Sequence, residues 1–244
     1  MGKRLIQQAR GKGGPRYRTP SFRFPGKVKY NKSQDKEQKG IVTDIIKSQG
    51  HSAPIAKVKF DDGTEGLSIA PEGMKIGNTV VDGKEAPQES GNTLPLENLP
   101  EGTLVFNIEG IPGDGGKFCR SSGTFARILS KSGDKITIEL PSKRKKSFNK
   151  ECKASIGIVS GGGRPEKPFL KAGTKHYRMK IKNTVYPIVS GSAMNAVDHP
   201  FGNKRTSRKS KARPTSRNAP PGRKVGMIAA RRTGRKVHRV KHDE

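Results

Sequence analysis

The chain has 244 residues and a formal net charge of +29, from 50 Lys and Arg against 21 Asp and Glu. An isolated globular protein gains nothing from such self-repulsion, so the charge indicates a polyanionic partner, and nucleic acid fits best because each neutralised phosphate releases counterions. The hydrophobic share of 30% without any Trp excludes one large core, since about 45–50% is usual when Gly is counted.

Charge is concentrated at the two ends of the chain. Residues 1–36 hold eleven bases and one acid, and residues 164–244 hold twenty-two bases and four acids. Between them, residues 37–100 have a net charge of −4 and residues 101–163 a net charge of +5. This pattern predicts a basic N-terminal arm (1–36) and a basic C-terminal extension (164–244) that flank a nearly neutral middle and grip the partner with two basic segments.

The arm is rich in Gly and Pro, which excludes a long helix or a central strand. Its cations alternate with Tyr17, Phe22, Phe24 and Tyr30. A solubilising tail is the alternative interpretation, but such a tail needs no aromatic residues between its charges. We expect the arm to be disordered alone and to become ordered on its partner.

The middle of the chain predicts a mainly β fold with two groups of short strands. Asp61-Asp62-Gly63 and Ser132-Gly133-Asp134 are the turns of two hairpins. The groups predict two small barrels, residues 37–87 and 88–163, of the kind that are marginally stable alone. The expected strands are Gly40–Lys47, Ile55–Phe60, Thr64–Ala70, Thr79–Val81, Leu104–Ile108, Thr124–Ser130, Lys135–Leu140 and Ala154–Val159.

The C-terminal extension begins after the glycine run that ends at Gly163. One short helix is expected within residues 166–182. A second is expected near 223–232, where Pro220-Pro221-Gly222 precedes an apolar stretch and cations would lie at the helix C-terminus. Gly, Pro and basic residues dominate the rest.

Two segments have the composition of catalytic motifs. Gly113–Lys117 (GDGGK) is similar to a phosphate loop, but the Walker pattern requires Gly at 111 and Ser or Thr at 118. The chain has Ile111 and Phe118 there, so a loop between strands is the better interpretation.

Ser192, Asp198 and His199 could be drawn as a triad, but no nucleophile elbow is present, and proximity in sequence does not establish triad geometry. His199 beside a carboxylate could act as a general base. In a basic extension a histidine more often stacks on RNA or forms hydrogen bonds with it, which is the interpretation we favour.

Metal, disulfide and membrane signals are weak. His238 and His242 have metal-ligand spacing but no second pair of ligands, and Cys119 and Cys152 are too few for a disulfide framework. No apolar run approaches the roughly 20 residues of a membrane span. We therefore predict a cytoplasmic protein with no catalytic residue, metal site, cofactor, membrane partner or small-molecule substrate.

Five segments closely resemble the L-two family, the universal second proteins of the large ribosomal subunit, and they run in the family's order. The first residues, MGKRLIQQARGKG, and the compact length are of the archaeal type. Two departures are Ser190, where relatives commonly have Arg, and Phe201-Gly202-Asn203, where many have a longer glycine run. The segments are Gly91–Pro95 (GNTLP), Leu99–Asn107 (LPEGTLVFN), Ser122–Phe125 (SGTF), Ser190–Gly202 (SGSAMNAVDHPFG) and Val225–Gly234 (VGMIAARRTG).

The resemblance implies an OB-like barrel followed by an SH3-like barrel, with both extensions between rRNA helices. It implies a structural constituent of the large subunit that binds rRNA, supports assembly and association with the small subunit across a bridge, and organises rRNA near the peptidyl transferase centre. Neighbouring ribosomal proteins and tRNA are further expected neighbours, and Mg²⁺ is expected on the rRNA only. His199 would then have a structural role, because the chemistry belongs to the rRNA.

The expected RNA-binding residues are cations that neutralise phosphates, glycines that let the backbone approach RNA closely, and side chains that stack or fill grooves. The runner-up is a non-ribosomal nucleic-acid factor of the transcription or chromatin type. The predicted residues are Arg10, Lys12, Arg16, Arg18, Arg23, Lys27, Gly191, Met194, Asn195, His199, Gly202, Lys204, Arg205, Arg208, Arg213, Arg217, Arg231, Arg232 and Arg235.

Overall fold

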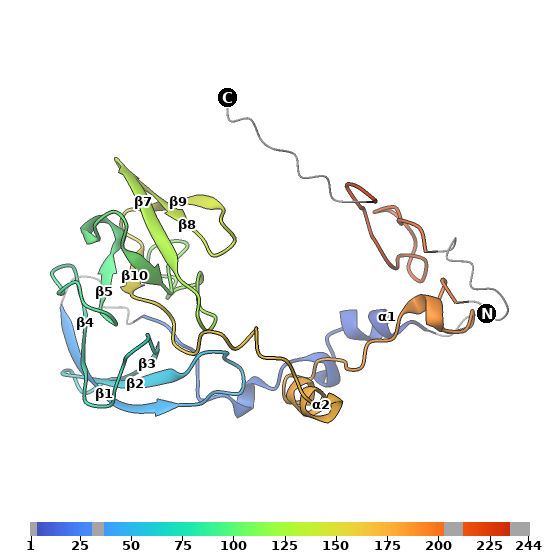
Figure 1. Ribbon diagram of the computed structural model, residues 1–244, viewed down its shortest axis with the longest axis horizontal. Helices are drawn as coiled ribbons and strands as arrows, with labels where there is room; N and C mark the ends of the chain where they lie inside the picture. The colour runs from blue at the N-terminus through green and yellow to red at the C-terminus, as the bar shows by residue number, and fades with distance from the viewer. Residues whose placement is uncertain (1–3, 31–36, 203–211, 235–244) are drawn as a thin grey trace. The chain divides into compact units, whose positions relative to one another are not determined.

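A computed structural model describes residues 4–30, 37–202 and 212–234 (Figure 1). They form two compact units, one of residues 21–172 and one that combines the described residues of 1–20 and 173–244. The beginning of the arm and most of the extension therefore belong to the same unit. Contacts between segments so far apart in sequence cannot be deduced from charge counts, and the two-handed grip of a partner stays a prediction.

Ten strands form one sheet in the order β3-β2-β1-β4-β5-β10-β6-β7-β8-β9. All eight predicted strands are present, and the chain is mainly β, in agreement with an OB-like and an SH3-like domain. The strands are β1 (Gln38–Ile46), β2 (Ile55–Phe60), β3 (Glu65–Ile69), β4 (Thr79–Asp82), β5 (Thr93–Pro95), β6 (Leu104–Phe106), β7 (Ala126–Ser132), β8 (Lys135–Glu139), β9 (Lys145–Asn149) and β10 (Lys153–Ile156).

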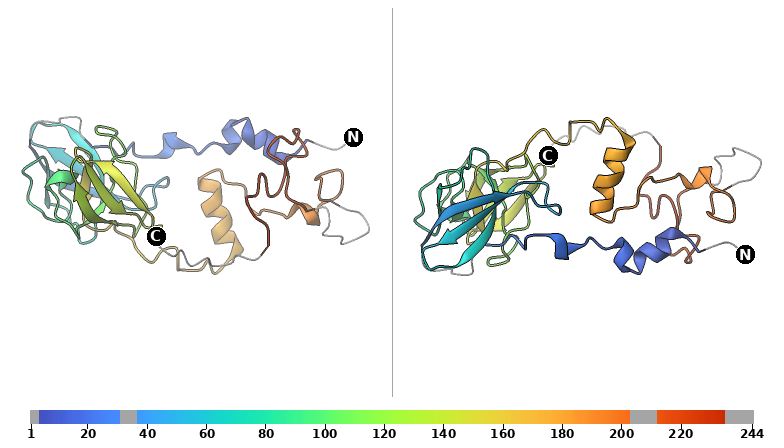
Figure 2. Two further views of the ribbon diagram at one scale, coloured as in Figure 1. Left: turned by 90° about the horizontal axis from the view of Figure 1, so that it is seen from above. Right: turned by 90° about the horizontal axis from the view of Figure 1, so that it is seen from below.

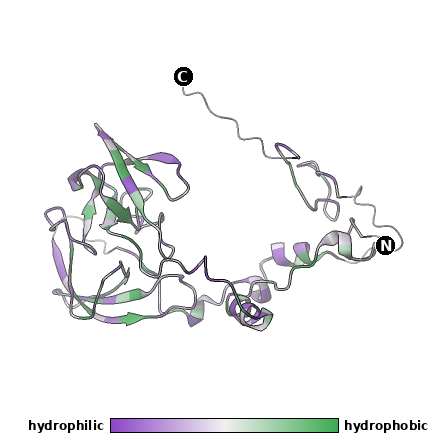
Figure 3. Cartoon of the chain, viewed as in Figure 1, coloured by the Kyte–Doolittle hydropathy of each residue, from purple (hydrophilic) through white to green (hydrophobic). Residues whose placement is uncertain are grey.

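Alternation of apolar and polar residues explains several of the strands. In β8 the side chains of Ile136 and Ile138 are buried while Lys135 is exposed, as expected for a strand with one face on a core. Figure 3 shows this alternation of hydropathy along the strands. Both predicted hairpin turns are confirmed, with positive φ angles of 80° at Gly63 and 55° at Gly133, which glycine adopts without strain.

Two strands were not predicted. β5 is three residues long, ends on Pro95 and lies in a stretch rich in Pro and Gly, although all three residues are buried. β9 contains the end of a run of cations, and only Phe148 among its side chains is buried. Neither strand can be recognised from its composition. Pairing with neighbouring strands holds them in the sheet, and local propensity does not.

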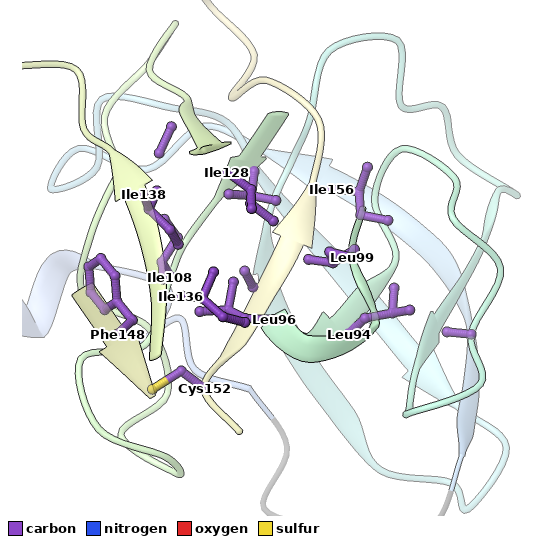
Figure 4. Packing of buried hydrophobic residues seen from close by; sticks show 14 of the residues in the cluster. Leu94, Leu96, Leu99, Ile108, Ile128, Ile136, Ile138, Phe148, Cys152 and Ile156 are labelled. Atoms are coloured by element: carbon purple, nitrogen blue, oxygen red, sulfur yellow. The ribbon is translucent and has the colours of Figure 1, made fainter. Parts of the chain in front are cut away.

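Three clusters of buried side chains fill the first unit. One lies among β1–β4 around Val42 and Val58. A larger one lies among β5–β10 and includes Leu96, Ile128 and Ile138 (Figure 4). The third, which includes Phe106, joins residues of both strand groups. Figure 2 shows the cyan strands of the first group beside the green and yellow strands of the second, so the two groups share part of one core.

A polar junction also links the two strand groups. Asp82 of β4 pairs with Thr93 of β5 in a parallel bridge. The Asp82 carboxylate forms an ion pair with the ammonium of Lys153 from β10, at 2.8 Å. The Thr93 and Ser155 hydroxyls are 3.0 Å apart.

Tyr30 of the arm donates its hydroxyl hydrogen to the carbonyl of Asn107 at 2.6 Å and lies 3.0 Å from the Ser155 hydroxyl. Burial raises the pKa of Tyr30 far above its usual range. The predicted boundaries of the arm, barrels and extension stay predictions.

The described helices are short. In the arm they are α1 (Ile6–Gly11), η1 (Pro15–Tyr17) and η2 (Ser21–Arg23). The first unit has η3 (Leu96–Asn98), and the extension has α2 (Ala172–Ile181) and η4 (Gly191–Ala193). The helix expected within residues 166–182 is confirmed as α2.

The expectation of a helix near 223–232 was wrong. Thr215 and Ile228 form a parallel bridge, with Thr215 N–H donating to the carbonyl of Met227 and Ala229 N–H to that of Thr215, both at 2.9 Å. Gly226 and Ala229 have positive φ angles of 76° and 48°, which an α-helix excludes. Pairing with a distant segment therefore overrides the helical propensity of this stretch.

Candidate nucleic-acid interface

The loop with the phosphate-loop composition is closed around its own carboxylates. The Glu109 side chain, 1% exposed, accepts N–H groups from Gly113, Gly115 and Lys153 at 3.2, 2.9 and 3.0 Å. Asp114 accepts N–H groups from Gly110, Ile111 and Gly116. The loop amides that would bind a phosphate therefore already donate to acids, which excludes a nucleotide-binding loop here.

Asp114 also keeps a cation beside this loop. Its carboxylate lies 3.1 Å from the ammonium of Lys117. Burial alone would raise the pKa of the Asp114 carboxyl, but Lys117 and the three N–H groups outweigh burial and lower that pKa. Asp114 is thus ionised at neutral pH, and the loop has a fixed shape on which the arm can pack.

The end of the arm is anchored on loops between the strands. The Phe24 ring lies so close to Gly50 that a Cβ there would overlap it, and it meets His51 edge-on at 6.3 Å. Arg120 donates to the carbonyl of Val28 at 2.9 Å, and Val28 itself is buried. Residues 24–30 therefore pack on loops and strands of the chain itself, which corrects the expectation that the whole arm needs a partner to become ordered.

A groove of about 710 Å³ lies between this anchored segment and the loop. We call it the arm groove. It is lined by Phe22, whose side chain is 83% exposed, and by four cations: Lys27, Lys29, Lys117 and Arg120. Asp114 is the one acid in its lining. An exposed aromatic ring among cations can stack on an unpaired base while the cations bind the neighbouring phosphates.

The sequence identified only part of the arm groove. Lys27 was predicted to bind RNA, and Arg23 lies next to Phe22 with its guanidinium 5.4 Å from the ring. Lys29, Lys117 and Arg120 were not predicted to bind RNA. Arg120 stands two residues before the SGTF segment, so its position beside a family motif was the available signal.

In the second unit, Ser190–Gly202 forms a tight loop. A Cβ at Gly191 would overlap the His199 ring, and a Cβ at Gly202 would overlap the Asn195 carbonyl. The N–H of His199 donates to that carbonyl at 3.1 Å. Both glycines are therefore required for packing within the protein. Their predicted contact with RNA stays a prediction, as do those of Met194 and Asn195.

The His199 ring is held in one orientation. Its Nδ1 accepts the N–H of Phe201 at 3.0 Å, and the two rings meet edge-on at 5.1 Å. Neutral His199 must therefore carry its proton on Nε2. In a Ser-His-Asp triad Nδ1 instead donates to the carboxylate, so this geometry excludes the triad with Ser192 and Asp198 and leaves Nε2–H as a donor.

Replacing Gly202 with Ala is expected to destabilise this loop by about 1–3 kcal/mol, the usual cost of overpacking. The added Cβ would overlap a backbone carbonyl, which cannot rotate away. Hydrogen exchange at the His199 and Gly202 amides measures the effect. Gly173→Ala in α2 is the control, because a Cβ there meets open space. Unchanged exchange in Gly202→Ala would contradict the packing argument.

The remaining predicted residues are dispersed. Arg10, Lys12, Arg16 and Arg18 are exposed on the first part of the arm. A second set is exposed on the loops of 212–234: Arg213, Arg217, Arg231 and Arg232. A third set lies outside the described residues: Lys204, Arg205, Arg208 and Arg235.

In the described part of the chain no helix is long and apolar enough to cross a membrane. Within the same ranges no three His, Cys, Asp or Glu side chains gather as metal ligands. Cys119 and Cys152 are free thiols, and burial raises the pKa of each to about 11, so both are inert at neutral pH.

Two small β domains with basic extensions and a cation-lined groove define a nucleic-acid-binding protein of the ribonucleoprotein class. Residues 3–82 match the family model described as Ribosomal Proteins L2, RNA binding N-terminal domain, and residues 89–219 match Ribosomal Proteins L2, C-terminal domain. The chain belongs to the ribosomal protein L2 family.

Relatives are similar over almost their whole length. The large ribosomal subunit protein uL2 of Methanothermobacter thermautotrophicus is 52% identical over 242 residues, and that of Methanosphaera stadtmanae 54% over 243, each covering 97% of this chain and 100% of the relative. The uL2 protein of Methanopyrus kandleri is 47% identical over 239 residues, covering 96% of this chain and 98% of the relative. The chain is therefore a structural constituent of the large ribosomal subunit, located in the ribosome in the cytoplasm, and it is not an enzyme.

Proposed function

We propose that the protein binds large-subunit rRNA through the arm groove and the basic extensions, and that it thereby supports subunit assembly and association with the small subunit. The observation that carries this proposal is that four cations and the exposed ring of Phe22 line one groove. The cations neutralise phosphates, and the ring stacks on an unpaired base. Arg120, fixed by the carbonyls of Gly116 and Val28, holds the arm in place beside the groove.

The Ser190–Gly202 loop has a different part in the proposal. Its internal hydrogen bonds and the contact of His199 with Gly191 fix the direction of the imidazole. The Nε2–H can then donate to a phosphate, carbonyl or ring-nitrogen acceptor of rRNA. In this way the loop organises rRNA near the peptidyl transferase centre without taking part in the chemistry. Neighbouring ribosomal proteins and tRNA are further proposed neighbours, and Mg²⁺ is held by the rRNA and not by the protein.

Phe22→Ala is expected to weaken binding to protein-free large-subunit rRNA about tenfold or more, because stacking contributes about 1–3 kcal/mol per base. The salt dependence of binding should be unchanged, since no cation is lost. Lys27→Gln should instead reduce the slope of log K against log salt concentration by about 0.7–0.9. Filter binding over a salt series measures both effects.

The matched control is Ile41→Ala, which removes another exposed apolar side chain (51% exposed), in this case from β1. It should bind as the unchanged protein does. Equal affinities for Phe22→Ala and Ile41→Ala would show that the arm groove does not stack a base. The proposal would then lose the observation that carries it.

A further inference from the structure

A second groove, of about 540 Å³, lies between the N-terminal arm and the turn that follows α2. On the arm side it is lined by Gln7, Arg10 and Tyr17, and on the other side by Lys182, Asn183 and Val185. The two sides are more than 160 residues apart in sequence and belong to the same compact unit. We call this groove the clasp groove.

Asn183 joins the two sides. Its Nδ2 donates to the carbonyl of Arg18 at 2.8 Å and to the carbonyl of Pro15 at 3.2 Å. Asn183 has a positive φ of 50°, and its backbone N–H donates to the carbonyl of Lys180 at 3.1 Å. Both features are expected for Asn at the end of a helix. One residue thus ends α2 and uses both hydrogens of its amide to bind the arm.

The charge of the clasp groove favours an anion. Arg10 lies on one side and Lys182 on the other, and no carboxylate lines it. The C-terminal end of α2 opposes an anion, but this effect is small and confined to the last turn. The N–H groups of Lys182 and Thr184 both donate to the carbonyl of Met179, so this carbonyl of the last turn has hydrogen-bond partners. Two cations from opposite sides therefore determine the sign of the potential.

We propose that the clasp groove binds one nucleotide of a non-helical rRNA segment, with its phosphate between Arg10 and Lys182, and that Asn183 is the positioning residue that assembles the groove. This inference rests on the proposed binding of rRNA. The volume is in the range of small-ligand sites and suits one nucleotide. The half-buried Tyr17 ring supplies a surface for its base or ribose.

The test is a double-mutant cycle with full-length protein and protein-free large-subunit rRNA. Arg10→Gln alone should weaken binding about tenfold, a fold-change equivalent to about 1.4 kcal/mol. In an Asn183→Asp background, where a carboxylate faces two carbonyl oxygens, Arg10→Gln should change binding less than twofold, because the groove is already open. Additive effects would overturn the proposal.

Two variants make the result decisive. Asn183→Gly keeps the positive φ without the amide, so it carries the same cycle if Asn183→Asp fails to fold. Lys180→Gln removes an exposed cation of α2 that does not line the groove, and its effect should be the same in both backgrounds. If the unchanged protein does not bind rRNA, the proposed function fails. If it binds but the cycle is additive, only the clasp groove fails.

Discussion

Deletion of residues 203–244 should sharply flatten the salt dependence of rRNA binding. The segment holds fifteen bases and two acids. Each phosphate contact contributes about 0.7–0.9 to the slope of log K against log salt concentration, and six to ten contacts change affinity about 10³–10⁵-fold between 50 and 200 mM salt. Such a loss of salt dependence would exceed that caused by any single substitution. Filter binding with protein-free large-subunit rRNA over a salt series measures it.

The deletion also removes packing within the second unit, because Gly226 lies against the Phe201 ring. A second variant separates charge from packing. Replacing Arg235, Lys236, Arg239 and Lys241 with Gln leaves every described residue in place and should reduce the slope by about three if all four bind phosphate. An unchanged slope in both variants would show that this segment does not touch phosphate.

The sequence predicted the strands well because short runs of apolar residues, in several strands alternating with polar ones as in β1 and β8, separate them from the turns. All eight expected strands appear, and both hairpin turns occur at the predicted residues. The two strands that were missed have no local signal. β5 is a buried segment of three residues, and β9 is mostly exposed and charged. Such strands depend on their partners, which a single sequence does not reveal.

The candidate sites were predicted less completely, because they depend on contacts between distant segments. Arg120 meets the carbonyl of Val28, 92 residues earlier, and Asn183 meets the arm across 165 residues. Neither residue has a motif of its own for RNA binding. The glycines at 191 and 202 were singled out for contact with RNA, which stays a prediction. The structure gives them a reason within the protein, namely the close approach of His199 and Asn195.

The junction between the strand groups depends on a buried ion pair. The side chains of Asp82 and Lys153 are 8% and 12% exposed and lie 2.8 Å apart. Burial raises the pKa of Asp82, although Lys153 opposes this. The raised pKa means that the attraction of Lys153 does not fully offset the loss of hydration. Removing one partner of such a pair lowers the free energy of unfolding strongly, whereas replacing both partners with apolar residues changes it little.

Lys153→Met is therefore expected to lower the free energy of unfolding by about 3–5 kcal/mol, because the Asp82 carboxylate loses its cation in a buried place. The backbone N–H of Lys153, which donates to Glu109, is retained in this variant. Urea unfolding of the full-length protein measures the change. Since small domains have only about 5–15 kcal/mol of stability, such a loss should also lower the yield of folded protein.

The double variant Asp82→Leu, Lys153→Met is the decisive control. It removes both charges and should recover most of the stability, ending within about 1–2 kcal/mol of the unchanged protein, because no buried charge is left without a partner. If the double variant were as unstable as Lys153→Met, packing at β10 and not the stranded carboxylate would explain the loss. Recovery would show that the loss in Lys153→Met comes from the buried carboxylate left without a partner, and that the two strand groups can meet through apolar burial without the ion pair.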